Sequence, residues 1–137
     1  MATGKLDFTS LRNALIRLDE GYQRYLLDTS DIQIRDGLIQ RYEFTYEVSH
    51  KILKRYLETT SASLEIYDSM PFSDLIRSGN EQSLLLGNWN QWQVYREMRI
   101  KSSRADDEEL ALEVVSIIPE FILEDKELLK QLELRNA

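Results

Sequence analysis

The sequence predicts an all-α protein, an up-and-down antiparallel bundle of four to five helices that forms a single domain over residues 1–137. Apolar residues recur at intervals of three and four over long stretches, which is the spacing of one face of an α-helix. These stretches are joined by short polar connections that contain capping residues, and short connections favour antiparallel neighbours. The sequence shows no strand pattern, internal repeat or low-complexity tract.

The predicted helix over Ile34–Glu58 organises the chain, because it is long, contains no proline and is apolar on two faces. One face carries Leu38, Tyr42, Thr45, Val48, Ile52 and Tyr56, and the other carries Ile39, Tyr42, Tyr46, Leu53 and Leu57. A helix that is apolar on two faces must be covered twice. We therefore expect one face in the core of the chain and the other under a further helix or a second subunit. Asp31 is a suitable N-cap.

The first predicted helix runs from about Leu11 to Leu26, after a short lead over residues 1–8. Its apolar side chains form a single stripe made of Leu11, Leu15, Leu18, Tyr22 and Tyr25. The candidate N-caps are Asp7, Thr9 and Ser10, whose short side chains can accept from free amide groups. Gly21 either weakens this helix slightly or allows another helix to approach closely.

The middle of the chain is predicted to contain one short helix. Residues 59–70 are polar and are expected to form a loop with one irregular turn. Pro71 fits the start of a helix that continues through Ser78, and Gly79 and Asn80 are expected to end it. The three following leucines, Leu84, Leu85 and Leu86, are expected to fill the core.

Two capping boxes predict the last two helices. Asn88 with Gln91 favours a helix that reaches about Lys101, and Ser103 with Asp106 favours the start of the final helix. The final helix is expected to bury Leu110, Val114, Ile117, Ile118 and Phe121. Pro119 is expected to kink or interrupt it before a tail that carries Leu128, Leu129 and Leu132.

Composition limits the function classes. The net charge of −7 argues against a general nucleic-acid binder, which needs a basic face. The chain has no cysteine, so disulfides, zinc thiolates and a thiol nucleophile are excluded. The N-terminal residues lack the apolar core of a signal peptide, and no apolar run approaches the length of a membrane span. We therefore expect a cytoplasmic protein without a membrane segment.

His50 is the only histidine, and with Glu47 it forms a Glu-x-x-His pair one helical turn apart. In di-iron bundles this spacing directs two ligands inward, but such a site needs a second pair and two further carboxylates. Only a homodimer could supply them, so we favour a half-buried or interface histidine and expect no metal or cofactor. No serine lies in the context of a nucleophile elbow, and no glycine-rich phosphate loop is present.

Arg96, Arg99, Lys101 and Arg104 form a basic cluster in an otherwise acidic chain. Helical spacing places Arg96 beside Arg99, and two adjacent guanidinium groups can hold a phosphate or carboxylate. Salt bridges to Glu97 and to the acidic run over residues 106–109 are the favoured alternative. Trp89 and Trp92 are better explained as core or interface anchors than as a platform for stacking bases.

The stretch RDGLIQRYEFTYEVSHKILKRYLE, over Arg35–Glu58, resembles the central helix of the nucleotidyltransferase substrate-binding-protein-like family. This family comprises small helical proteins of the HEPN type, related to HepT toxins and to the C-terminal domain of kanamycin nucleotidyltransferase. The similarity covers most of the chain. The first helix, FSDLIRSG over Phe72–Gly79, NWNQW over Asn88–Trp92 and REMR over Arg96–Arg99 follow in the expected order.

The chain departs from the family pattern at the residues that carry catalysis. HEPN ribonucleases resemble one another through an arginine followed after four to six residues by a histidine, often within RN-x-x-S-H-x-Y. Arg99 and Ser103 match this pattern, but Ile100, Arg104 and Asp106 replace its asparagine, histidine and tyrosine. Arginine stays protonated and cannot act as a general base at neutral pH. His50 also stands where family members usually have tryptophan.

The resemblance therefore implies a non-catalytic subunit that works with a separate small nucleotidyltransferase, which would hold the metal-binding carboxylates and the nucleotide. We expect a homodimer with Tyr42, Tyr46, His50, Trp89 and Trp92 at its interface. We expect Arg96, Arg99 and Arg104 to bind an anion such as a nucleotide or another phosphate-bearing molecule. The alternatives are a ribonuclease toxin with an atypical active site and a purely structural interaction module.

Overall fold

The computed structural model describes residues 6–61 and 65–135, and within these ranges it contains helices and no strand. The helices are α1 (Thr9–Leu27), α2 (Ile32–Thr59), α3 (Glu65–Asp68), α4 (Phe72–Glu81), α5 (Trp89–Lys101) and α6 (Glu108–Arg135), with a 3₁₀ turn at Ser102–Arg104. The all-α prediction is confirmed. Residues 1–5 of the predicted lead and residues 62–64 of the predicted loop lie outside the described residues.

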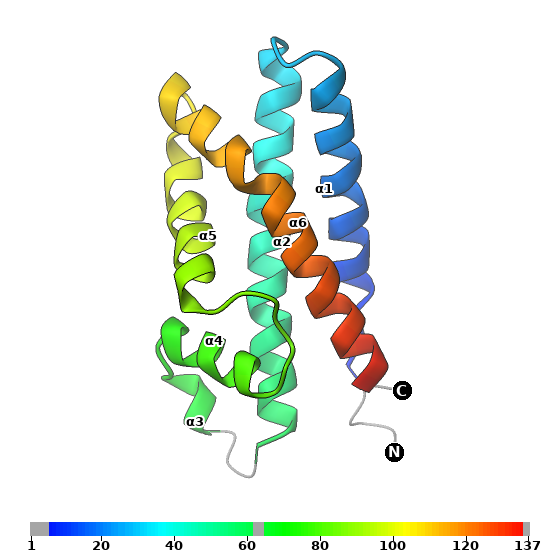
Figure 1. The fold of residues 1–137 in the computed structure, drawn as a ribbon, viewed down its shortest axis with the longest axis vertical. Coiled ribbons are helices and arrows are strands. Elements are labelled where there is room, and N and C mark those ends of the chain that lie inside the picture. Colours follow the sequence, from blue (N-terminus) through cyan, green and yellow to red (C-terminus); the bar gives the residue numbers. More distant parts are fainter. Residues whose placement is uncertain (1–5, 62–64, 136–137) are drawn as a thin grey trace.

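The helices pack around α2. The α1 and α2 helices form an antiparallel hairpin, and α6 crosses both of them diagonally (Figure 1). The α5 helix lies along the other side of α2, and α3 and α4 pack near the end of α2 that is distant from the hairpin turn. None of the helices among the described residues is both long enough and apolar enough to cross a membrane.

The α2 helix begins and is covered as its sequence predicts. The Asp31 carboxylate accepts a hydrogen bond of 3.0 Å from the Ile34 backbone N–H, which confirms the predicted cap. Both apolar faces are covered by helices of the same chain, with α1 on one side and α4, α5 and α6 on the others. The second face of α2 therefore needs no second subunit to cover it.

The aromatic side chains of α2 and α5 lie in the core. Tyr42, Tyr46 and Trp92 are 0%, 5% and 1% exposed. The Tyr42 hydroxyl donates to the Tyr95 carbonyl at 2.6 Å, and its ring packs edge-on against Phe121 with ring centres 5.0 Å apart. The expectation that Tyr42, Tyr46 and Trp92 lie at a subunit interface is therefore wrong, because the chain itself buries them.

The segment after α4 differs from the prediction. Gly79 does not end α4, which continues to Glu81; the chain turns at Ser83, whose φ is 59°. A Cβ on Gly79 would lie 2.9 Å from the Leu85 side chain, so this glycine allows close packing. Leu84 is fully buried, but Leu86 is 63% exposed, so the leucines do not all fill the core.

The start of α5 follows the prediction and the start of α6 does not. Asn88 and Gln91 form the predicted capping box. Ser103 instead donates its hydroxyl to the Ile100 carbonyl within the 3₁₀ turn, and the Asp107 carboxylate accepts from the Leu110 backbone N–H. Pro119 does not interrupt α6, since the buried side chains on both sides of it hold the helix in the core.

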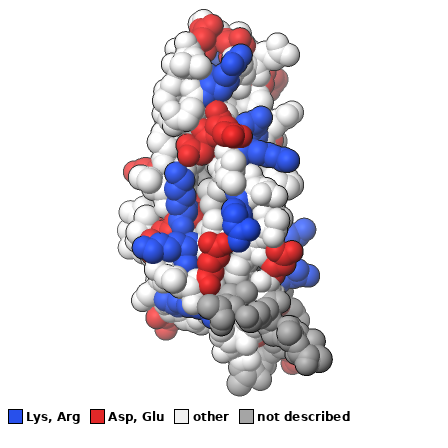
Figure 2. Space-filling view, turned by 90° about the vertical axis from the view of Figure 1, so that its right-hand side faces the viewer, with Lys and Arg blue, Asp and Glu red and all other residues white. Residues whose placement is uncertain are grey.

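Ion pairs between distant residues tie α1 to α6. Arg12 pairs with Glu133, and Lys126 pairs with Asp19 at 3.2 Å. Figure 2 shows the face that lies on the right-hand side of Figure 1, where Lys and Arg side chains are interspersed with Asp and Glu side chains. The face in view therefore has no continuous basic surface of the kind that binds nucleic acid without sequence preference.

Candidate functional site

Arg99 lies where α5 meets α2. Its Nε donates to Glu47 Oε1 at 2.9 Å, and its Nη1 lies 3.4 Å from Glu43 Oε2. The Ser102 hydroxyl donates to the same Glu43 oxygen at 2.7 Å. We call these four residues, Glu43, Glu47, Arg99 and Ser102, the Arg99 cluster. Two carboxylates one helical turn apart on α2 therefore neutralise the guanidinium group.

The rest of the predicted basic cluster does not join Arg99 in holding an open anion site. Lys101 pairs with Glu113 at 2.9 Å. Arg96 and Arg104 are exposed and make no ion pair within the described part of the chain. The salt-bridge interpretation is thus correct for Arg99 and Lys101. Their partners differ from the predicted ones, because the glutamates come from α2 and α6 rather than from Glu97 and residues 106–109.

His50 lies on α2, one turn beyond Glu47, and is half-buried against aromatic rings. Its ring centre is 4.5 Å from that of Phe72 and 6.4 Å from that of Tyr46. Burial lowers the pKa of His50, and the positive charges of Lys54 and Arg96 lower it further. The carboxylate of Glu47 acts in the opposite direction and raises this pKa. The imidazole is therefore neutral near pH 7. The described residues contain no group of three or more side chains able to hold a metal ion.

An acidic groove lies beside the Arg99 cluster. It has a volume of about 590 Å³ and is lined by Asp36, Ile39, Gln40, Glu43, Ser102, Ser103, Ala105 and Asp106. Three of these side chains are carboxylates and none is basic. Asp106, which stands at the tyrosine position of the ribonuclease pattern, lines this groove together with Ser102 and Ser103. A nucleic-acid backbone placed there would meet negative charge, which weakens its binding.

Two neighbouring carboxyl groups on α6 are buried, and sequence analysis did not identify them. Glu124 accepts from the backbone N–H groups of Leu86 at 2.7 Å and Gly87 at 2.8 Å, and burial raises its pKa. Asp125 is fully buried and hydrogen-bonded to Ser49, and burial raises its pKa well above the ordinary value. Their positions in the sequence carry no signal, because acidic residues in a long amphipathic helix are normally on its solvent face.

One family model matches a range that spans all of the helices except the last residue of α6. The family described as nucleotidyltransferase substrate binding protein like matches residues 6–134. The chain belongs to this family. The resemblance predicted from the sequence is confirmed, and so is the helical fold that it implied.

A curated relative and a solved structure, both from Haemophilus influenzae, are similar to this chain. One, named as a probable ribonuclease HepT, is 32% identical over 144 residues, which cover 99% of this chain and 98% of that protein. A solved structure, described as revealing the fold of a substrate binding domain of a nucleotidyltransferase, is similar with a TM-score of 0.85 at 29% identity. The match covers 93% of this chain and 99% of that one.

Proposed function

We propose that this protein is a non-catalytic, substrate-binding or regulatory subunit that dimerises and works with a separate small nucleotidyltransferase. The environment of Arg99 carries the proposal. Arg99 is held by Glu43 and Glu47, and Arg104 occupies the position five residues later where a ribonuclease of this pattern has its histidine. A guanidinium group cannot accept the proton of a ribose 2′-hydroxyl at neutral pH, so the pair lacks a general base.

The family description supports the pairing with a nucleotidyltransferase, since it names substrate binding for that class of enzyme. The test is calorimetric titration of this chain with a purified small nucleotidyltransferase that lacks a helical domain of its own. We expect saturable binding and a change in the rate of nucleotidyl transfer. Absence of binding at micromolar concentrations of both proteins would contradict the pairing.

A partly exposed aromatic ridge supports the dimer. His50, Phe72 and Trp89 make successive ring contacts of 4.5 and 5.7 Å, and all three keep part of their surface open to solvent. Obligate homodimer interfaces bury about 2,000 Å² or more and are rich in such side chains. Sedimentation equilibrium should show twice the 16.1 kDa mass of the chain. Trp89→Glu should yield monomers, while Leu112→Glu, at an exposed position on α6, should not.

A ribonuclease with an atypical site is the second candidate, because His50 is neutral near pH 7 and follows Glu47, the partner of Arg99, by one helical turn. The name of the HepT relative also favours it. An RNA-cleavage assay should compare the native chain with Arg104→His and with His50→Ala. We expect no cleavage by the native chain above background. Cleavage that His50→Ala abolishes would establish the ribonuclease instead.

A further inference from the structure

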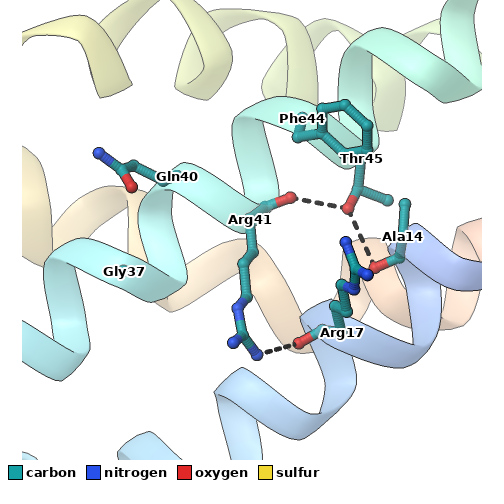
Figure 3. Close-up of a pocket in the computed structure, with 7 residues that line it drawn as sticks. All are labelled: Ala14, Arg17, Gly37, Gln40, Arg41, Phe44 and Thr45. Atoms are coloured by element: carbon teal, nitrogen blue, oxygen red, sulfur yellow. Dashed lines mark hydrogen bonds between the residues drawn. The ribbon is translucent and has the colours of Figure 1, made fainter.

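A second groove lies between α1 and α2, and Gln40 separates it from the acidic groove. The α1–α2 groove has a volume of about 540 Å³ and is lined by Ala14, Arg17, Gly37, Gln40, Arg41, Phe44 and Thr45 (Figure 3). Pockets that bind small molecules typically have volumes of about 300–1,000 Å³. The groove is therefore large enough for a compact ligand.

The α1–α2 groove is lined by basic side chains, whereas the neighbouring groove is lined by acidic ones. The lining of the α1–α2 groove contains two arginines and no carboxylate, in a chain with a net charge of −7. Figure 3 shows the Arg41 guanidinium at the Arg17 carbonyl and the Arg17 side chain extending the other way, towards Ala14 and Thr45, and neither arginine forms an ion pair with a described residue. Arg41 uses one N–H on the Arg17 carbonyl at 2.7 Å, and a guanidinium group has five. The remaining donors are available to an anion.

The position of the Arg41 side chain depends on a glycine of α1. A Cβ on Gly21 would lie 3.1 Å from Arg41 Cδ and 3.2 Å from its Nη1, so a larger residue would displace the guanidinium group. Glycine weakens the middle of a helix relative to alanine. Gly21 therefore lowers the stability of α1 at the point where the Arg41 side chain reaches this helix. In return it leaves room for the guanidinium group, which occupies this position without a ligand.

An aromatic ring and an open space complete the groove. Phe44 follows Arg41 by three residues on the same face of α2, and its side chain is 57% exposed. Apart from its chain neighbours and the local backbone of α2, no described heavy atom lies within 4 Å of the position that a Cβ on Gly37 would occupy. One groove lined by an exposed ring and two arginines matches a ligand with an aromatic base and phosphate groups, since bases stack on aromatic side chains and phosphates bind arginine.

We propose that the α1–α2 groove binds a nucleoside phosphate, with Arg17 and Arg41 on the phosphate groups and Phe44 against the base. The site goes beyond the proposed function, because all of its residues come from one chain and it requires neither a dimer nor a nucleotidyltransferase. It also relocates the anion site, since Arg99 is neutralised by glutamates and the groove beside it is acidic.

The test is calorimetric titration of the full chain at low salt with ATP, tripolyphosphate and adenosine. We expect ATP to bind more tightly than tripolyphosphate, with adenosine the weakest, and we expect added salt to weaken both phosphate-bearing probes. Arg41→Gln should lower the affinity for both by about tenfold or more, since a charged hydrogen bond is lost. Phe44→Ala should reduce ATP to the level of tripolyphosphate and leave tripolyphosphate unchanged.

Two further variants keep the test decisive. Gly37→Leu fills the open space and retains both arginines, so it should weaken ATP binding even if Arg41→Gln unfolds. Arg96→Gln removes an exposed, unpaired arginine from α5 and should change nothing. The proposal is overturned if ATP gives no saturable heat at millimolar concentration, or if Arg96→Gln weakens binding as much as Arg41→Gln. Equal binding of ATP and tripolyphosphate, or tighter binding of a poly-glutamate peptide, would also overturn it.

Discussion

Asp125 provides the sharpest stability test of the fold. Its side chain is fully buried, its Oδ2 contacts the Ser49 hydroxyl, and its Oδ1 has no hydrogen-bond partner among the described residues. The Ser49 hydroxyl also lies 2.7 Å from the Thr45 carbonyl, which can only accept. If Asp125 is protonated, both hydroxyl hydrogens find an acceptor: the carboxyl O–H donates to the Ser49 oxygen, and the Ser49 O–H donates to the Thr45 carbonyl. An ionised Asp125 would compete with Thr45 for the single hydroxyl hydrogen.

The substitution Asp125→Asn removes the ionisation and keeps the shape. Burial raises the pKa of Asp125 well above its ordinary value of 3.8, so the folded state retains a proton that the unfolded chain releases. Between these two pKa values, the contribution of Asp125 to the free energy of unfolding falls by about 1.4 kcal/mol for each unit of rising pH. The variant lacks this dependence. Its extra buried amide N–H costs about 1–3 kcal/mol, and this cost does not vary with pH.

The assay is urea unfolding followed by circular dichroism between about pH 4.5 and about pH 6.5. The free energy of unfolding of the variant, relative to that of the native chain, should rise with pH by up to about 1.4 kcal/mol per unit until the pH reaches the raised pKa of Asp125. The neighbouring Glu124 is present in both proteins, so most of its effect cancels in the difference. Glu120→Gln, an exposed position on α6, should follow the native profile. Parallel profiles for Asp125→Asn and the native chain would refute the buried neutral carboxyl.

Three further predictions use the same measurements. Glu124→Gln should lower the free energy of unfolding by about 1–3 kcal/mol, because one of the two backbone N–H groups that Glu124 binds loses its acceptor; an unchanged urea midpoint would contradict this role. His50→Phe should reduce the loss of unfolding free energy at acidic pH. Burial lowers the pKa of His50, so the stability that its neutral imidazole contributes is lost as the pH falls below 6.5. Native-like loss of stability in this variant would exclude His50 as the cause. Gly21→Ala should change stability by no more than about 1 kcal/mol in either direction, because better helix propensity offsets the contact with Arg41. It should nevertheless weaken ATP binding, and unaltered ATP affinity would show that Gly21 does not position Arg41.

Most of the helices could be predicted because their signals are local. Asp31 and the box of Asn88 with Gln91 lie within one turn of the amides that they cap, so the sequence contains all the information needed. Gly79 shows where local reasoning fails. A glycine at the end of a short apolar segment predicts a helix terminus, yet this one makes room for Leu85, a contact that only the folded chain defines.

The candidate site was harder to predict, for the same reason. The proximity of Arg96 and Arg99 follows from helical spacing, but the partners of Arg99 lie on α2, more than fifty residues earlier in the chain. Similarly, the spacing of Tyr42 and Tyr46 shows that they are buried without showing what buries them. Periodicity cannot distinguish burial under a helix of the same chain from burial under a second subunit. Here the helices of the same chain bury both tyrosines.

The two grooves that Gln40 lines differ in charge because α2 directs charged side chains of opposite sign to its two sides. Glu43 faces the α5 side of α2 and binds Arg99, whereas Arg41, two residues earlier, reaches the α1 side and pairs with no carboxylate of the described residues. Residues two apart on a helix point in widely different directions, so one helix supplies both charges to separate surfaces. A phosphate approaching Arg99 must compete with Glu43 and Glu47 and cross an acidic groove. The same phosphate meets no carboxylate among the residues that line the α1–α2 groove. Electrostatics therefore favour the α1–α2 groove over the acidic groove for an anionic ligand.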